Sequence, residues 1–273
     1  MQSSSYQDPL FKLALQCDLD HRQLFKNLLS QGNLEQRILA ARALGWMRSA
    51  SCAPALVSAL QDLEPNVRRW SIASLALSWD NHATLILCEL FLKEPDLHVR
   101  TAILRTLGWQ RAKLANLTCL NALHPSEADC VRAEAIRALG RIDVQTNLGV
   151  LINALDDPSA LVRQHALRTI LNQPADIIKN KLIERSNDLD PEARAIAIRG
   201  IAYYQDESMI DHLIKGLDDR NPCVRANAAI ALGNCNFAFD LKVLINKEND
   251  PHPEVRARVM EAIQKRNSAP FNG

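Results

Sequence analysis

The chain has 273 residues, of which 47% are hydrophobic and 23% are charged. Its 32 Lys and Arg residues are balanced by 31 Asp and Glu residues, and the resulting formal net charge of +1 excludes a global field that would attract nucleic acid or a membrane surface. The chain has no run of 18 apolar residues, and its N-terminus lacks the basic-then-apolar order of a secretion signal. We therefore expect a cytoplasmic protein that does not contact membranes.

Residues 1–18 are predicted to form a capping segment. A polar start is followed by an apolar series that includes Leu10, Phe11 and Leu13, which is typical of a short helix. Eight segments of similar length follow it, and residues 267–273 form a predicted flexible tail. The eight segments are 19–48, 49–80, 81–112, 113–143, 144–174, 175–205, 206–236 and 237–266. We treat 19–266 as one domain, because a repeat array has no single core to divide.

An arginine recurs every 31 or 32 residues and defines these segments. Valine precedes it in six of the eight, and Leu or Ile follows seven residues later in all of them. A period this regular predicts stacked supersecondary units, each with a first helix, a tight turn and a second helix that contains the arginine. We number positions in each repeat from this reference arginine. The reference arginines are Arg37, Arg68, Arg100, Arg132, Arg163, Arg194, Arg225 and Arg256.

The turns between the two helices have a repeated chemistry. An acidic residue lies six positions before the reference arginine in six repeats, namely at Asp62, Glu94, Asp157, Asp188, Asp219 and Asp250. This spacing predicts that each arginine pairs with an acid of its own turn or of the adjacent turn. An exposed pair of this kind contributes only about 0–1 kcal/mol, so we assign these residues a structural role. Prolines such as Pro65, Pro191 and Pro222 are predicted to begin the second helices.

The repeat resembles a known family. Its pattern is Asp-x-x-x-x-Val-Arg-x-x-Ala-x-x-Ala-Leu-Gly, and the final glycine is present at Gly45, Gly108, Gly140 and Gly233. This pattern is similar to the HEAT repeat, in the short form found in phycobilisome lyases. The resemblance implies an all-α fold, a right-handed α-solenoid or superhelix of about eight two-helix HEAT-like repeats. It implies less about function, because this unit is reused in bilin lyase subunits, DNA glycosylases, toxin-immunity proteins and scaffolds.

Functional residues are expected where the fold leaves side chains free. On the second helix, positions +1, +2, +5 and +9 face away from the apolar side, and in HEAT-like arrays this side forms the concave surface. Position +5 contains five arginines, and positions +2 and +9 contain three of the four tryptophans. Trp and Arg are the residues that most often anchor binding interfaces. The candidate site is Trp46, Trp70, Trp109, Arg42, Arg105, Arg137, Arg141, His165, Arg168, Arg199 and Tyr203.

Simpler interpretations of these residues stay open. The arginines could serve solubility alone or pair within the groove with Glu134, and the tryptophans could pack against the next repeat. Trp79 lies beyond its second helix, so we assign it to the core between repeats.

Catalytic and metal-binding patterns are lacking. The seven histidines are scattered without an HExxH motif, and the sequence has no GxSxG, P-loop or GxGxxG motif. His98 and Cys130 occupy the same position in neighbouring repeats, but two ligands are too few for a metal. The seven cysteines are odd in number and form no CxxC pair, so we expect reduced thiols. We expect no catalytic residue, no metal and no cofactor.

The sequence predicts a non-enzymatic scaffold that binds a protein partner through its Trp and Arg side chains, as a monomer or within a heterocomplex. Resemblance to phycobilisome lyases gives an alternative, a subunit that handles an open-chain tetrapyrrole and places its propionates on arginines. Nucleic-acid binding, as in the HEAT-like glycosylases, ranks third because the overall charge is neutral.

Overall fold

The structure is a computed structural model that describes residues 21–77, 81–171 and 173–268. The predicted capping segment and Trp79 lie outside these residues. Helix α16 ends at Ser268, two residues into the predicted tail, and residues 269–273 lie outside the described part. Contacts divide the chain into an N-terminal unit, Met1–Leu148, and a C-terminal unit, Gly149–Gly273. The single repeat domain over 19–266 stays a prediction.

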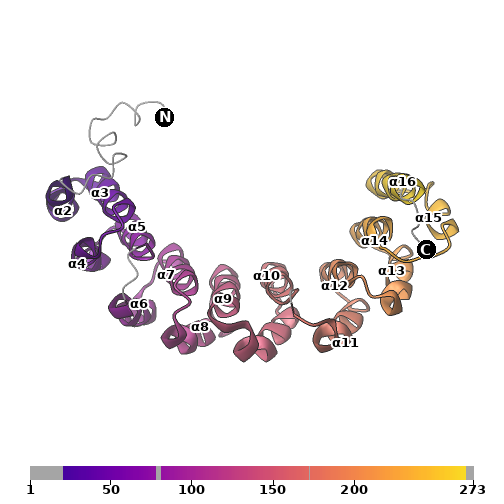
Figure 1. Cartoon of the computed structure of the whole chain (residues 1–273), viewed down its shortest axis with the longest axis horizontal. Coiled ribbons are helices and arrows are strands. Elements are labelled where there is room, and N and C mark those ends of the chain that lie inside the picture. Colours follow the sequence, from indigo (N-terminus) through magenta and orange to yellow (C-terminus); the bar gives the residue numbers. More distant parts are fainter. Residues whose placement is uncertain (1–20, 78–80, 172, 269–273) are drawn as a thin grey trace. The chain divides into compact units, whose positions relative to one another are not determined.

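The N-terminal unit consists of helices in two layers (Figure 1). Its second helices are α3 (Leu34–Trp46), α5 (Pro65–Leu75), α7 (Leu97–Trp109) and the first part of α9 (Asp129–Asn153). Its first helices are α2 (Arg22–Gln31), α4 (Ala53–Ser58), α6 (Asn81–Lys93) and α8 (Asn116–Asn121). Short 3-10 turns, η3 (Ala50–Cys52), η4 (Ala59–Gln61) and η5 (Lys113–Ala115), flank α4 and precede α8. Consecutive second helices pack on one another, so each repeat completes the core of the one before it.

The C-terminal unit repeats this arrangement (Figure 1). Its second helices are α10 (Ala160–Ile170), α12 (Pro191–Tyr204), α14 (Pro222–Asn234) and α16 (Pro253–Ser268). Its first helices are the end of α9, α11 (Ala175–Arg185), α13 (Ile210–Gly216) and α15 (Lys242–Ile245), with 3-10 turns at η6 (Ala154–Asp156) and η7 (Glu207–Met209). The all-α solenoid fold is confirmed, and the described residues contain no strand.

Local sequence explains where the helices begin. Asn33 and Gln36 form a capping box at α3, and Asp96, Asp190 and Asn221 accept hydrogen bonds from the first backbone N–H groups of α7, α12 and α14. Within α9, Asp143 has extended backbone angles (φ −165°, ψ 101°) and accepts from the N–H groups of the following turn. This break falls at the boundary predicted between repeats 113–143 and 144–174.

Glycine allows neighbouring second helices to approach closely. A Cβ atom on Gly108 would lie 2.8 Å from Ala138 Cα, and one on Gly233 would lie 2.7 Å from Ala262 Cα. Both neighbours are backbone atoms that cannot move without displacing a helix. The Leu-Gly pair of the repeat therefore combines a buried leucine with a contact between helix backbones.

Each reference arginine joins two successive turns. Arg194 donates to both carboxylate oxygens of Asp219 in the next turn, at 2.6 and 2.7 Å, and to two carbonyls of its own turn. Arg225 binds Asp250 in the same way, with two distances of 2.8 Å. The acid also accepts the backbone N–H group two residues beyond it, as Asp250 does from His252. We call these contacts the arginine ladder; further pairs are Arg37 with Asp62, Arg68 with Glu94, Arg100 with Glu127, and Arg163 with Asp190 and Glu192.

The arginine ladder differs from the prediction in two respects. For Arg163 the prediction allows Asp157 of its own turn or Asp188 of the adjacent turn. In the structure Asp188 binds Arg185, and Arg163 pairs with Asp190 and Glu192 at the start of α12. Some of the pairs are also buried: Arg194 and Asp219 have side chains that are 7% and 12% exposed, and those of Arg225 and Asp250 are 12% and 4% exposed. Removing one partner of a buried pair leaves a charge without compensation, which costs more than the loss of a surface pair.

The arginine ladder makes stability depend on pH at Asp250. Its hydrogen bond from Arg225 is the main reason that the pKa of this carboxyl lies below its ordinary value. A carboxyl with a lowered pKa contributes fully above its unfolded pKa of about 4, and the contribution is lost as the pH falls through the folded pKa. We expect Asp250→Asn to lower the unfolding free energy by about 1–3 kcal/mol at pH 7 and by progressively less below pH about 4.

Urea unfolding followed by circular dichroism between pH 7 and pH 3 measures this difference. Glu248, an exposed carboxylate near Asp250, provides a matched control through Glu248→Gln. A constant difference across the pH range, or an equal effect of the control, would contradict the assignment.

Candidate functional site

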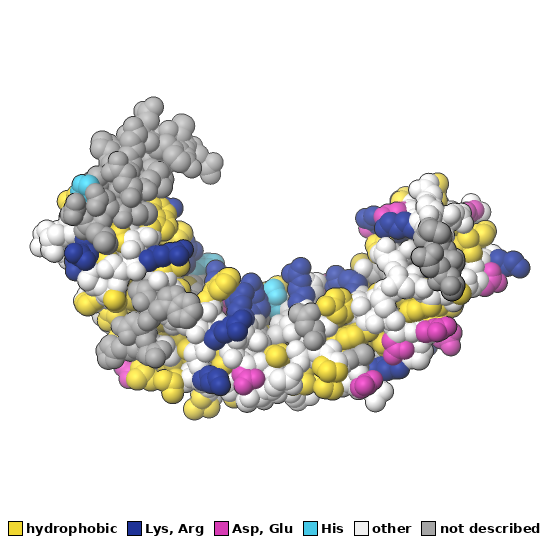
Figure 2. All heavy atoms as spheres, viewed as in Figure 1, with side chains coloured by type: hydrophobic (Ala, Val, Ile, Leu, Met, Phe, Trp, Pro, Cys, Tyr) yellow, Lys and Arg dark blue, Asp and Glu magenta, His cyan; other side chains and the backbone are white. Residues whose placement is uncertain are grey.

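The arginines at position +5 lie on the free side of the second-helix layer. Figure 2 shows Lys and Arg side chains gathered along this side in both units. In the C-terminal unit Arg168 and Arg199 are exposed and make no ion pair within the described residues. In the N-terminal unit Arg105 is exposed, whereas Arg42 and Arg137 are half-buried. The helical phase of the arginine row therefore matches the prediction, but the two units differ in what surrounds it.

Arg42 lies between two of the candidate tryptophans. Its guanidinium carbon is 5.2 Å from the ring centroid of Trp46 and 4.7 Å from that of Trp70, and Arg69 approaches Trp70 at 5.7 Å. Both rings are half-buried. Cation–π contacts of this kind contribute about 0.5–1 kcal/mol at partly exposed sites, so part of each ring serves contacts inside the protein.

Trp109 is more accessible than the other described tryptophans. It ends α7 and is 63% exposed, with the guanidinium of Arg141 stacked 4.6 Å from its ring centroid. A large apolar side chain held by a cation on one face presents its other face to a ligand at a low entropic cost.

Glu134 forms ion pairs with three of the candidate arginines. It is 5% exposed, and its carboxylate lies 3.4 Å from Arg105, 3.4 Å from Arg137 and 4.0 Å from Arg141. We call Glu134 and these arginines the Glu134 cluster. Burial first, and then the charge of Arg137, lower the pKa of Arg141, although Glu134 opposes the change. One carboxylate neutralises one of three cations, which leaves a local excess of positive charge.

A hollow of about 690 Å³ lies between α5 and α7. Its apolar wall includes Trp70, Trp109 and Leu77, and Ala73 and Ala76 leave space because their side chains are short. Its polar lining consists of Arg48, Arg69, His98, Thr101, Arg105 and Thr106. This volume is typical of sites that bind small molecules or single anchoring side chains.

The hollow includes residues that the sequence prediction omitted. Arg69 and Thr101 occupy position +1, which the helical wheel placed on the side that faces away from the apolar face. Their helical phase could therefore have identified them as candidate site residues. Arg48 follows α3 with a positive φ of 47°, which no periodicity indicates.

Position +2 is more covered than the wheel predicted. Ala102, Glu134 and Ile196 at this position are 7%, 5% and 4% exposed. The neighbouring second helix covers position +2 in these repeats, whereas Trp70 is half-buried and Arg258 is exposed there, so the free side of the layer is centred on positions +5 and +9.

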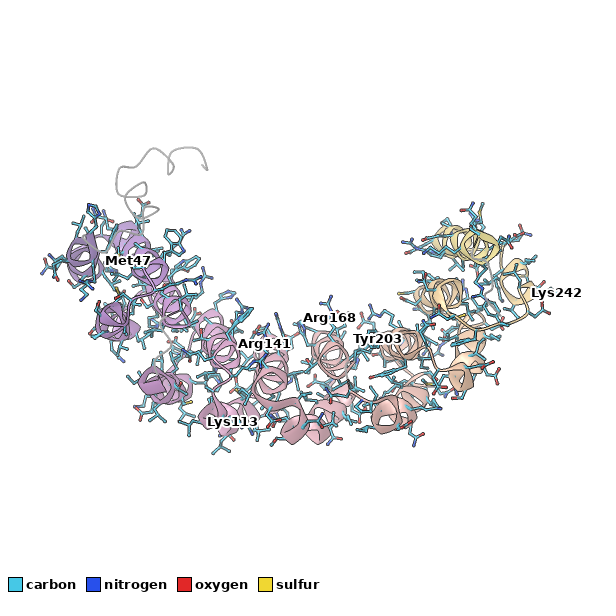
Figure 3. All side chains as sticks on the ribbon, viewed as in Figure 1. Met47, Lys113, Arg141, Arg168, Tyr203 and Lys242 are labelled. Carbon is cyan, nitrogen blue, oxygen red and sulfur yellow. The ribbon has the colours of Figure 1, made fainter. Side chains whose placement is uncertain are left out.

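The C-terminal unit contains the remaining candidates. Arg168 and Tyr203 project from α10 and α12 on the side opposite to α11 (Figure 3), and Tyr203 is 51% exposed. Its ring meets that of Tyr204 edge-on, with centroids 5.5 Å apart. Tyr204 donates to the carbonyl of Ile170, and burial raises its pKa to about 12. His165 is half-buried on α10.

Other kinds of site are not supported in the described part of the chain. No three His, Cys, Asp or Glu side chains there are arranged to hold a metal ion, including those around His98 and Cys130. No described helix is both long and apolar enough to cross a membrane.

The sequence profile of HEAT repeats matches residues 22–111, 117–173 and 180–263. The chain belongs to the HEAT-repeat family. A search of curated protein sequences gives no significant match.

Solved structures share the HEAT-repeat fold over nearly the whole chain. Escherichia coli YibA is 20% identical with a TM-score of 0.62, and the alignment covers 96% of this chain and 98% of YibA. The complex of CpcE and CpcF of phycocyanin lyase from Nostoc sp. PCC7120 gives 19% identity, a TM-score of 0.51 and coverages of 89% and 93%. Kap95p, solved in complex with RanGDP, is 17% identical with a TM-score of 0.68. The alignment covers 94% of this chain and 42% of Kap95p. At these identities the likeness shows the fold alone.

Exposure predicts how differently two aromatic residues contribute to stability. We expect Trp109→Ala to lower the unfolding free energy by about 1 kcal/mol, because its ring is mostly in solvent and loses mainly the contact with Arg141. Phe91 also lies under an arginine, Arg100 at 4.0 Å, but is 2% exposed, so Phe91→Ala should cost about 3–5 kcal/mol. Thermal and urea unfolding compare the two; similar losses would place the indole in the core.

Proposed function

We propose that this HEAT-repeat protein is a non-enzymatic scaffold that binds a protein partner on the free side of its second helices. The exposed Trp109 beside the hollow is the observation that best supports it. Its ring is 63% exposed although a stacked guanidinium and the wall of the hollow hold it in place. Interface anchors have this combination of large accessible area and few rotamers to lose.

The surrounding residues support the same function. Trp46, Trp70, Arg42, Arg105, Arg137 and Arg141 extend the surface along the N-terminal unit. His165, Arg168, Arg199 and Tyr203 give the C-terminal unit a surface of the same composition. Two of the similar structures, the CpcE and CpcF complex and Kap95p with RanGDP, are themselves complexes of a protein with a partner. Candidate arginine or aromatic side chains come from six of the eight repeats, and a surface built from successive repeats suits an extended partner segment.

The test is affinity capture from native cell lysate with the full chain, followed by calorimetric titration of the captured protein. We expect Trp109→Ala to weaken binding by about 2–4 kcal/mol, because the loss of an anchor exposes its pocket to water. Leu117→Ala is the matched control, since this leucine is 67% exposed on α8 in the opposite layer. A partner that binds the Trp109 variant as tightly as the wild type, or that weakens equally with the control, would contradict the proposal.

A second candidate function is the handling of an open-chain tetrapyrrole. In the hollow, the rings of Trp70 and Trp109 are placed to stack on the pigment, and Arg69 and Arg105 are placed to bind its propionates. The likeness to the CpcE and CpcF complex of phycocyanin lyase also supports this function. Mixing the protein with biliverdin should then shift the absorption spectrum of the pigment, and Trp109→Ala should abolish the shift. An unchanged spectrum at saturating protein would exclude this function.

A further inference from the structure

We propose that the hollow and the Glu134 cluster form one site for a short acidic segment of the partner, with an apolar side chain in the hollow and carboxylates on the cluster. This inference rests on the proposed function and assigns the chemistry of the partner. It concerns the N-terminal unit alone, because all the residues involved lie between Arg48 and Arg141.

The two parts of the site share residues. Arg105 lines the hollow and also lies 3.4 Å from the carboxylate of Glu134. Trp109, one helical turn further along α7, lines the hollow and stacks on Arg141 of the Glu134 cluster. An apolar side chain in the hollow would therefore place the neighbouring residues of its segment next to Arg105 and Arg137.

The positive charge of the site indicates that the partner segment is acidic. Among the residues that the structure describes, no acidic side chain lines the hollow, whereas Arg48, Arg69 and Arg105 do. In the Glu134 cluster a single carboxylate faces three guanidinium groups, so about two positive charges are not neutralised. A partner carboxylate would gain charge-assisted hydrogen bonds there, and a basic segment would be repelled.

Access also favours this pair of arginines. The side chains of Arg105 and Arg137 are 53% and 38% exposed, and each meets Glu134 at 3.4 Å, a weak hydrogen-bond distance. The arginines of the ladder cannot take this role. Arg68, for example, donates at 2.6 and 2.8 Å to Glu94 and binds two turn carbonyls, which leaves little capacity for a ligand.

The size of the hollow fits a side chain better than a bare anion. At about 690 Å³, with two indoles in its wall, it has room for an aromatic or branched aliphatic group and the backbone beside it. Burial of such a group supplies affinity, and the adjacent arginines select its sequence context.

A phage-displayed random dodecapeptide library, selected on the full chain, tests the inference. We expect enrichment of peptides in which Asp or Glu flanks an aromatic or aliphatic residue. The enriched peptide, synthesised with a fluorescein label, is then titrated by fluorescence anisotropy against the wild type and its variants, after circular dichroism has confirmed that each variant is folded.

Two substitutions should change the affinity for this peptide in opposite directions. Arg105→Gln should weaken it about tenfold or more through loss of a charge-assisted hydrogen bond. Glu134→Gln has nearly the same shape but removes the carboxylate that competes for the arginines, so it should tighten binding by about threefold or more. A purely structural Glu134 would give weaker or unchanged binding. Lys113→Gln is the control, because Lys113 is exposed on the first-helix layer (Figure 3).

The outcomes separate this inference from the proposed function. Peptides without acidic residues that bind through Trp109 but ignore Arg105→Gln would overturn the inference and leave the scaffold function standing. Enrichment of basic peptides would also overturn the inference. So would a selection in which no enriched peptide needs Trp109 for binding. The scaffold function would also be contradicted only if Trp109→Ala leaves the capture of a partner from lysate unchanged. Should Glu134→Gln fail to fold, Arg105→Gln decides alone, because its side chain is 53% exposed.

Discussion

The fold depends on a buried guanidinium that bonds two successive turns at once. Arg194 donates to both oxygens of Asp219 in the next turn and to carbonyls of its own turn, and Arg225 does the same with Asp250. Turn carbonyls and carboxylates have few other partners in a buried position, so the arginine satisfies groups that would otherwise be costly to bury. This geometry fixes the register between neighbouring repeats.

Fixed register brings the second helices of successive repeats into close contact. Gly108 meets Ala138 and Gly233 meets Ala262 at distances that leave no room for a Cβ atom. Close approach buries position +2 in three repeats, at Ala102, Glu134 and Ile196, and leaves positions +5 and +9 nearer to solvent. The proposed binding surface is therefore a consequence of packing, since the side chains that remain outside are those that no neighbouring helix can cover.

The same residue type serves two purposes in this protein. Arginines of the ladder bind carboxylates tightly and are buried, whereas those around Glu134 share one acid at longer distances and remain partly exposed. Trp70 and Trp109 differ in a similar way, because Arg42 and Arg69 contact the first while the second is mostly in solvent. The surface thus combines groups that are held in place with charge that is not fully neutralised, a combination suited to recognition.

The period of the reference arginine, with valine before it and Leu or Ile seven residues later, was sufficient to predict the all-α solenoid and the buried faces. Helical phase is a local property of about 3.6 residues per turn, so the sequence also determined which arginines and tryptophans lie on one side. Only the tertiary structure decided how much of each is covered. The pairing of Arg105 with Glu134, the choice of Asp190 over Asp188 and the space beside Ala73 depend on side chains roughly one repeat away, whose distances are set by packing between helices and not by spacing along the chain.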